Sequence, residues 1–235
     1  DVYKRQVVVG AEKLPPKMAQ AFEKKFGCLP LEAYGATECS PGIAVNEQHA
    51  NQPGSIGRLL NKLEAKIVNP DTGEDQPSGE PGLLKVKGPN VMMGYLGMPD
   101  KTAEVLKDGW YNTGDIVRID EQGYLWIEGR LSRFSKIGGE MVPHGNVEET
   151  LNDLADQNEQ VFAVTGLPDE KKGERLAVVH TASEEVLEEV LSKLTDATIP
   201  NLWKPKRGQF LKVDKLPYLG TGKIDLKGLQ EIAQG

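Results

Sequence analysis

Four short segments of this sequence carry side chains that could bind a nucleotide and act on it. In the first, Tyr34–Glu38, an aromatic ring, a glycine, a hydroxyl and a carboxylate follow a predicted strand. Ligand sites in α/β sheets gather at the carboxyl ends of strands. The ring could stack on a purine, Thr37 could donate to a phosphate oxygen, and Glu38 could hold Mg²⁺, which prefers oxygen ligands. An ordinary turn that starts a helix at Thr37 is the alternative.

The second and third segments place an acid and a base after glycines. Asp115 ends the segment Trp110–Asp115, and an ionised carboxylate there could accept hydrogen bonds from two ribose hydroxyls. Arg130, after Gly129, could reach a ribose or a phosphate. The glycine pair of Lys136–Gly139 permits positive φ and close backbone approach. A simple turn at Asp115 and a flexible interdomain linker at 136–139 are the alternatives.

The fourth segment is Leu219–Lys223, close to the end of the chain. A lysine on a loop bordered by glycines could be brought into a site as a mobile point charge. It would then stabilise the charge that develops during attack on an α-phosphate. An unremarkable surface turn is the alternative.

The order and spacing of these segments resemble the motif set of the adenylate-forming superfamily, which holds acyl-CoA synthetases, nonribosomal peptide adenylation domains and firefly luciferase. The resemblance covers essentially all of residues 7–235, and residues 10–12 fall at the family's adenine-facing loop. Residues 129–144 and 92–115 are most similar to the acyl-[acyl-carrier-protein] synthetase branch, which includes the synthetase half of the bifunctional 2-acylglycerophosphoethanolamine acyltransferase.

The resemblance implies a nucleotide-binding set and a catalytic set. Tyr34 would stack on adenine, while Asp115 and Arg130 would grip the ribose. Thr37 would touch the α-phosphate, and Glu38 would hold Mg²⁺. The implied nucleotide-binding residues are Gly10, Ala11, Glu12, Tyr34, Gly35, Asp115 and Arg130, and the implied catalytic residues are Thr37, Glu38 and Lys223.

The resemblance also implies a hinge and a thiol channel. Ser132 sits at the hinge, where many members carry Asp or Lys, and the small domain would turn there between the two half-reactions. The implied channel residues are Lys136, Gly138 and Gly139. Two positions depart from the family: Met141 and Asp225 stand where many relatives have Arg. The family's phosphate loop is also absent and is expected upstream of residue 1, with much of the fatty-acid pocket.

The elements that must position these residues fall into three regions. Residues 1–53 have a βαβ-like rhythm, which favours a layered α/β arrangement. Residues 54–131 hold short alternating runs separated by turns, which predict an antiparallel sheet or small barrel. Residues 132–235 look like a separate α+β unit. The expected fold class is therefore α/β and α+β, with residues 1–131 ending a large adenylation domain and 132–235 forming a small mobile cap.

Apolar periodicity and turn signals predict the individual elements. The predicted helices are the segment from Pro15-Pro16 to Gly27, Lys101–Leu106, Asn146–Asp156, Ser183–Leu194 with Ser183 as its cap, and Leu226–Ala233. The predicted strands are Val7–Gly10, Leu29–Tyr34, Lys62–Val68, Gly82–Lys87, Ile116–Ile119, Tyr124–Ile127, Val161–Gly166, Leu176–Thr181 and Gln209–Val213.

Composition excludes several classes of protein. The net charge of -7 disfavours a broad nucleic-acid surface, so no nucleic acid is expected as a partner. Cys28 and Cys39 form no C-x-x-C motif, and a reducing compartment is expected. No run of about 18 apolar residues predicts a membrane span, and no signal peptide is recognised. The expected location is the cytoplasm, with the inner face of a bacterial membrane open for a longer parent carrying upstream domains.

The resemblance implies a long-chain fatty acid–[acyl-carrier-protein] ligase (AMP-forming) as the parent enzyme, using ATP, releasing AMP and requiring Mg²⁺. Its partners would be a fatty acid and a phosphopantetheine thiol of acyl carrier protein or coenzyme A. Lys204, Lys206 and Arg207 could attract an acidic carrier, or form a solvated loop. A fatty acyl-CoA ligase and a non-catalytic nucleotide- or partner-binding fragment are the alternatives, and this chain alone is expected to be inactive. An acyltransferase is disfavoured because no His-x₄-Asp pattern occurs.

Overall fold

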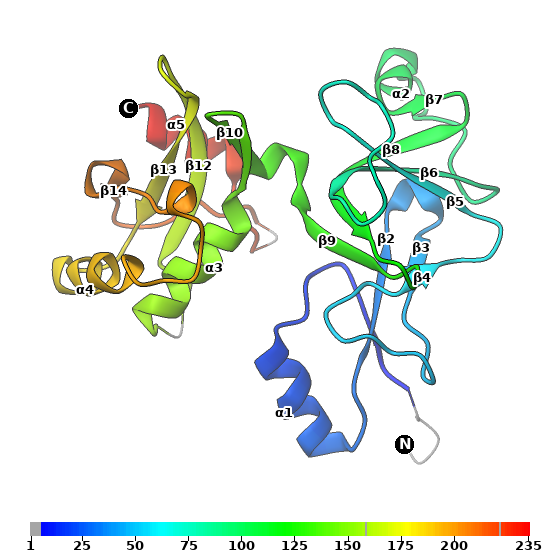
Figure 1. The fold of residues 1–235 in the computed structure, drawn as a ribbon, viewed down its shortest axis with the longest axis horizontal. Helices are drawn as coiled ribbons and strands as arrows, with labels where there is room; N and C mark the ends of the chain where they lie inside the picture. The colour runs from blue at the N-terminus through cyan, green and yellow to red at the C-terminus, as the bar shows by residue number, and fades with distance from the viewer. Residues whose placement is uncertain (1–5, 158, 221) are drawn as a thin grey trace. The chain divides into compact units, whose positions relative to one another are not determined.

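The computed structural model describes residues 6–157, 159–220 and 222–235 (Figure 1). The chain divides into two compact units, Asp1–Leu131 and Ser132–Gly235, and each is described by itself. The first six residues, whose origin the sequence leaves open, fall outside the described part except for Gln6. No helix of the described part is both long enough and apolar enough to cross a membrane.

The first unit begins with a parallel strand–helix–strand motif (Figure 1). Strands β1 (Val8–Val9) and β2 (Leu31–Gly35) pair in parallel, and helix α1 (Pro16–Phe26) connects them. Proline stands at the start of α1, and Gly27, with φ of 71°, ends it. The predicted βαβ rhythm is therefore confirmed. Strands β3 (Gly42–Val45) and β4 (Arg58–Leu59), which the sequence did not predict, extend this sheet in antiparallel fashion.

Helix α1 carries an apolar stripe that its own unit does not cover. Met18 and Phe26 are 60% and 58% exposed, and no residue of the helix is buried. Phe22 and Phe26 contact only one another as a ring pair, with centroids 4.5 Å apart. Helical spacing thus predicted the helix, while the core of this unit lies elsewhere.

A five-stranded antiparallel sheet forms the rest of the first unit (Figure 1). Its order is β5-β6-β8-β7, and β9 also pairs with β8. Helix α2 (Pro99–Val105) precedes β7, and a short 3-10 helix covers Thr37–Cys39. The strands are β5 (Glu64–Val68), β6 (Gly82–Lys87), β7 (Leu106–Lys107), β8 (Trp110–Ile119) and β9 (Leu125–Arg130). The predicted antiparallel sheet is confirmed.

One local prediction in this sheet is wrong. Residues 110–115, expected to end in a glycine turn, lie inside β8, which begins at Trp110 rather than at Ile116. The alternation of the strand buries Tyr111, Thr113 and Asp115 on one face. Gly114 adopts a φ of 74° without ending the strand, so a turn-forming residue is absorbed within the sheet.

The second unit is a sheet with helices on both faces. Its strand order is β11-β10-β13-β12, and β14 pairs in parallel with β13. The strands are β10 (Phe134–Ile137), β11 (Glu140–Pro143), β12 (Phe162–Asp169), β13 (Gly173–His180) and β14 (Phe210–Lys212). The helices are α3 (His144–Ala155), α4 (Glu184–Leu194) and α5 (Leu226–Gln234), with 3-10 turns at Leu131–Arg133, Asn201–Trp203 and Arg207–Gln209.

Alternating residues of β12 build two cores in this unit. Phe162 and Val164 join the cluster under α3 and α4, while Ala163 joins the cluster under α5. Ser183 caps α4, because its hydroxyl accepts from the amide of Val186 at 3.3 Å, as predicted. The expected α+β architecture is therefore observed.

Candidate functional site

A cavity of about 270 Å³ lies in the first unit, beside β1, β2 and the facing ends of β8 and β9. It is lined by Val9, Ala11, Glu12, Lys13, Glu32, Ala33, Tyr34, Gly35, Gly54, Ile56, Asp115, Ile127, Gly129 and Arg130. Six of the seven predicted nucleotide-binding residues are among them. Gly10 is outside the lining, next to Ala11. Segments up to about 120 positions apart in the sequence therefore meet at one cavity.

The polar centre of this cavity is the carboxylate of Asp115. Asp115 and Arg130 are directly opposite on β8 and β9, and the Arg130 Nε donates to Asp115 Oδ1 at 3.0 Å. The hydroxyl of Tyr34, on β2, donates to the other carboxylate oxygen. Asp115 is only 5% exposed, so its charge needs these partners. The Arg130 side chain is 70% exposed and can move toward a ligand.

Electrostatics fix the direction of the hydrogen bond between Tyr34 and Asp115. Burial, followed by the Asp115 charge, raises the pKa of Tyr34 far above its ordinary value. The phenol therefore stays protonated and acts as the donor. Asp115 stays the acceptor, which keeps a negative centre in the cavity.

Two glycines allow the backbone to form this wall. A Cβ on Gly10 would lie 2.9 Å from the Ala33 carbonyl oxygen, and one on Gly35 would lie 2.0 Å from the Pro41 carbonyl oxygen. The second distance is a collision with backbone, so Gly35 accepts no side chain without local rearrangement. Between Gly10 and the cavity, Ala11 adopts a φ of 71°, which is uncommon for a residue other than glycine.

The predicted catalytic residues Thr37 and Glu38 follow β2 on a 3-10 turn, outside the cavity lining. Thr37 is exposed, whereas Glu38 is partly buried. Tyr95 donates its hydroxyl to Glu38 Oε1 at 2.7 Å, and the amide of Met92 donates to the Glu38 carbonyl at 2.7 Å. The Tyr95 hydrogen bond lowers the pKa of Glu38, with smaller contributions from Tyr111 and Arg130. Glu38 is thus held in place as a carboxylate.

The role of Tyr95 is the main element of the site that the sequence did not reveal. Tyr95 lies 57 positions from Glu38, and neither its type nor its spacing marks it as a partner. The Tyr95 amide donates to Thr102 Oγ1 at 2.9 Å, and the same hydroxyl donates to the Met98 carbonyl at 2.9 Å. Because this loop is tied to α2, Tyr95 is fixed relative to Glu38.

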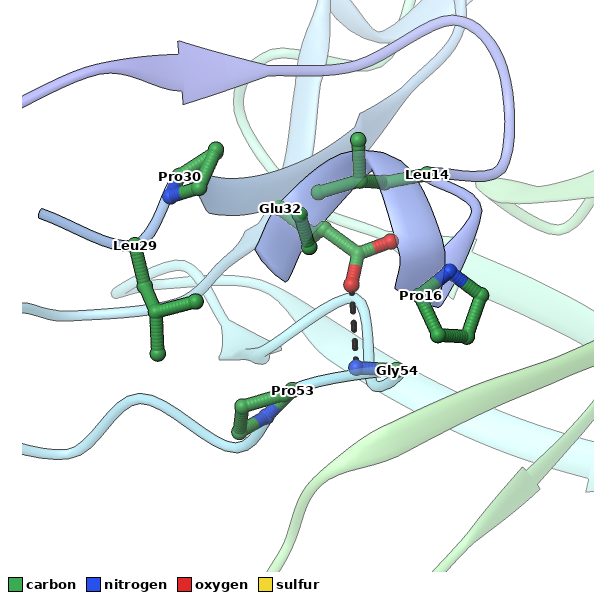
Figure 2. Close-up of a pocket in the computed structure, with 8 residues that line it drawn as sticks. Leu14, Pro16, Leu29, Pro30, Glu32, Pro53 and Gly54 are labelled. Atoms are coloured by element: carbon green, nitrogen blue, oxygen red, sulfur yellow. Dashed lines mark hydrogen bonds between the residues drawn. The ribbon is translucent and has the colours of Figure 1, made fainter. Parts of the chain in front are cut away.

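A second, mostly apolar cavity of about 170 Å³ adjoins the first (Figure 2). Leu14, Pro16 and Pro53 are among the residues that surround it. Glu32 and Gly54 line both cavities, and the Gly54 amide donates to Glu32 Oε1 at 3.0 Å. This hydrogen bond ties the loop before β4 to β2 and forms the wall between the cavities (Figure 2).

The remaining predicted residues belong to the second unit. Gly138 and Gly139, with φ of 59° and 92°, form the two-residue turn of the β10–β11 hairpin, so the linker alternative for this segment is wrong. Lys136 lies on β10, and Ser132 lies on the 3-10 turn that precedes it. Lys223 is exposed on a tight turn, where its carbonyl accepts from the Leu219 amide at 2.8 Å.

Two further predictions concern charge and metal. Of the three basic residues expected to attract a carrier, Arg207 is paired with Glu184 and Glu188, and Lys204 donates to the Thr195 carbonyl at 2.8 Å. Within the described residues, no group of three or more His, Cys, Asp or Glu could hold a metal ion. A cation at Glu38 would therefore need most of its ligands from a bound phosphate and water.

Comparison with known proteins identifies the class of enzyme. Residues 4–96 match the family model of AMP-binding enzymes. The chain is 36% identical over 220 residues to a long-chain-fatty-acid–CoA ligase of Escherichia coli O6:H1, covering 93% of this chain and 38% of that protein. It is 32% identical over 238 residues to luciferin 4-monooxygenase of Photinus pyralis, covering 97% and 42%.

Solved structures agree with this class. The crystal structure of ATP-bound MatB from Rhodopseudomonas palustris matches with a TM-score of 0.79 at 31% identity, covering 97% of this chain and 45% of that one. The chain belongs to the adenylate-forming superfamily of AMP-binding enzymes. It spans less than half the length of these relatives, between 38% and 45%.

Proposed function

We propose that this chain forms the carboxyl-terminal part of an ATP-dependent acid–CoA ligase, which makes an acyl-adenylate and passes the acyl group to a thiol. One observation carries the proposal: the cavity that joins Tyr34, Asp115 and Arg130 around one buried carboxylate. The first unit would end the large adenylation domain, and the second would be the cap that turns at Ser132. Family membership supports this division.

The cavity suits the nucleoside end of ATP. Its volume of about 270 Å³ is close to the lower end of ligand pockets, roughly 300 Å³. The Asp115 carboxylate would accept the ribose hydroxyls in charge-assisted hydrogen bonds, and the exposed Arg130 would close over the ribose or a phosphate. The ring of Tyr34 would lie against the adenine, with Gly10, Ala11, Glu12 and Gly35 supplying the neighbouring backbone.

The phosphates would lie toward Thr37 and Glu38. Glu38 is kept ionised, and Mg²⁺ beside a nucleotide commonly uses one or two carboxylates together with phosphate oxygens and water. Bound there, the ion would offset phosphate charge. Thr37 would donate to the α-phosphate as a carboxylate substrate attacks it, giving acyl-adenylate and pyrophosphate. Lys223 would add a point charge for this step, and the hairpin residues Lys136, Gly138 and Gly139 would border the thiol path in the second step.

Coenzyme A is the better-supported thiol donor. The relatives reported above include a long-chain-fatty-acid–CoA ligase, and further matches include a feruloyl-CoA synthase of Streptomyces. The carrier-protein hypothesis relied on a basic cluster, but Arg207 in that cluster is already paired with two glutamates. We therefore propose a long-chain fatty acid and coenzyme A as substrates.

The test is calorimetric titration of AMP into this 235-residue chain, which needs binding and no turnover. We expect wild-type binding, and at least about tenfold weaker binding by Asp115→Asn, because a charge-assisted hydrogen bond contributes about 1.5–3 kcal/mol. Glu121→Gln, an exposed acid on a turn, is the matched control and should bind normally. We also expect the wild type to bind 2′,3′-dideoxy-AMP more weakly than AMP and Asp115→Asn to bind both alike. A variant that retains the wild-type preference contradicts the ribose assignment.

A further inference from the structure

One face of the five-stranded sheet is rich in lysine. Lys66 on β5 stands directly opposite Lys85 on β6, and Lys107 on β7 stands opposite Trp110 on β8. Lys87 lies two positions after Lys85 and therefore on the same face. We call these four lysines and Trp110 the lysine face. The alternating residues of the same strands point into the core of the unit: Ala65, Ile67, Leu84, Val86, Leu106 and Tyr111.

The charges of the lysine face are not neutralised by the protein. In the described part of the chain, no ion pair joins Lys66, Lys85, Lys87 or Lys107 to an acid, although Glu64 stands opposite Lys87 in the sheet. Like charges directly opposite each other on neighbouring strands destabilise a sheet.

Trp110 lies at the centre of these charges and offers them one favourable contact. The Nζ atoms of Lys66 and Lys87 lie 4.5 Å and 5.9 Å from the centre of its ring. The side chain of Trp110 is partly exposed. The face therefore combines unneutralised cations with an amphipathic ring at the water boundary.

We propose that the lysine face binds the surface of an anionic lipid bilayer. A sheet face presents its lysines side by side, as a planar anionic surface requires, and each lysine near such a surface contributes to binding. Tryptophan is favoured at the membrane–water boundary, where Trp110 would lie between the lysine stems. The chain has a net charge of -7, so the rest of the molecule carries -11 without these four lysines. An anionic bilayer would repel that remainder and orient the protein by this face.

A protective role explains only part of the pattern. Lysines on edge strands prevent sheets from pairing with other chains, and this role suits Lys66 on β5. Lys85 and Lys87 belong to β6, which is hydrogen-bonded on both sides by β5 and β8 and has no edge to protect. An external anionic partner accounts for both groups of lysines.

The experiment is co-sedimentation of the chain with vesicles of equimolar phosphatidylcholine and phosphatidylglycerol, at low and high salt. We expect binding to these vesicles, little binding to pure phosphatidylcholine, and weakening with salt. Each lysine contributes roughly fivefold in affinity, so the quadruple variant K66Q/K85Q/K87Q/K107Q should lose more than about 100-fold. The control K17Q/K24Q/K171Q/K215Q makes the same charge change at exposed sites elsewhere and should lose far less.

Two further variants keep the test independent of folding. Replacing the same four lysines by arginine retains the charge and should retain binding, whereas Trp110→Ala retains all lysines and should weaken binding several-fold. Equal losses in the face variant and its control would overturn the proposal, as would binding to pure phosphatidylcholine alone. Binding to soluble polyglutamate without binding to vesicles would assign the face to an acidic protein instead. No nucleotide or acid is present, so the outcome is separate from that of the proposed function.

Discussion

His144 should make the second unit sensitive to acid. It begins α3, is 4% exposed, and its Nε2 lies 2.8 Å from the hydroxyl of Ser135. Burial, and then the nearby Arg133 charge, lowers the pKa of His144 from 6.5 to about 3. The folded unit therefore holds a neutral ring at a pH where the unfolded chain would protonate it.

The size of the effect follows from this difference. The contribution is fully present above pH 6.5 and decreases as the pH falls toward the folded pKa of about 3. At pH 5 the unfolded chain is about 1.5 pH units below its own pKa, so the free energy of unfolding should be about 2 kcal/mol lower than at pH 8. The limit near pH 3 is about 5 kcal/mol. His180, whose pKa is also lowered by burial, acts in the same direction, whereas Glu148, whose pKa burial raises, opposes it.

Urea unfolding of the second unit measures this effect. Trp203 fluorescence reports on that unit when Trp110 and Trp126, which belong to the first, are replaced by phenylalanine. The variant His144→Gln keeps a polar group beside Ser135 without titrating, so it should lose about 2 kcal/mol less between pH 8 and pH 5 than the wild type. Equal losses would refute the assignment. NMR titration of the wild-type imidazole is a second check, and a pKa above 5 there would also refute it.

Two other substitutions test the site. Gly35→Ala should destabilise the first unit by about 3 kcal/mol in chemical unfolding, because its Cβ would lie 2.0 Å from the Pro41 carbonyl oxygen. Gly145→Ala, with nothing within 4 Å, should cost nothing, and equal costs would contradict the steric argument. In the longer parent enzyme, Lys223→Ala should slow acyl-adenylate formation far more than thiol transfer from pre-made adenylate, as followed by pyrophosphate and AMP release. Lys227→Ala, exposed on α5, is the control, and equal slowing of both steps by Lys223→Ala would contradict its assigned charge role.

Most elements could be predicted because local pattern and tertiary role agree in them. In β6, alternation and β-branched residues match a strand with one buried face, and in α4 the Ser183 cap coincides with the start of an apolar stripe. The failures arose where tertiary pairing outweighed a local signal. Gly114 reads as a turn residue, but pairing on both sides keeps it within β8. Gly138-Gly139 reads equally as linker or hairpin, and only the pairing of β10 with β11 decides between them.

The site shows the same limit. Tyr34 and Asp115 were selected separately, and their resemblance to family motifs suggested that they act together. Their direct hydrogen bond joins residues 81 positions apart, and no spacing rule yields it. Tyr95 was missed for the same reason, since its partner Glu38 is 57 positions away. Residue types thus nominate candidates, whereas the partners that set their protonation come from the fold.

These partners also determine which part of the cavity can respond to a ligand. Each oxygen of the Asp115 carboxylate already accepts one hydrogen bond, from Arg130 and from Tyr34, and each oxygen has capacity for a second. Ribose hydroxyls could therefore be accepted without breaking either contact. Asp115 is held by burial and by two partners, while the Arg130 side chain is mostly exposed. Adjustment to a nucleotide should consequently fall on Arg130, with Asp115 and Tyr34 as the fixed reference that orients the ribose.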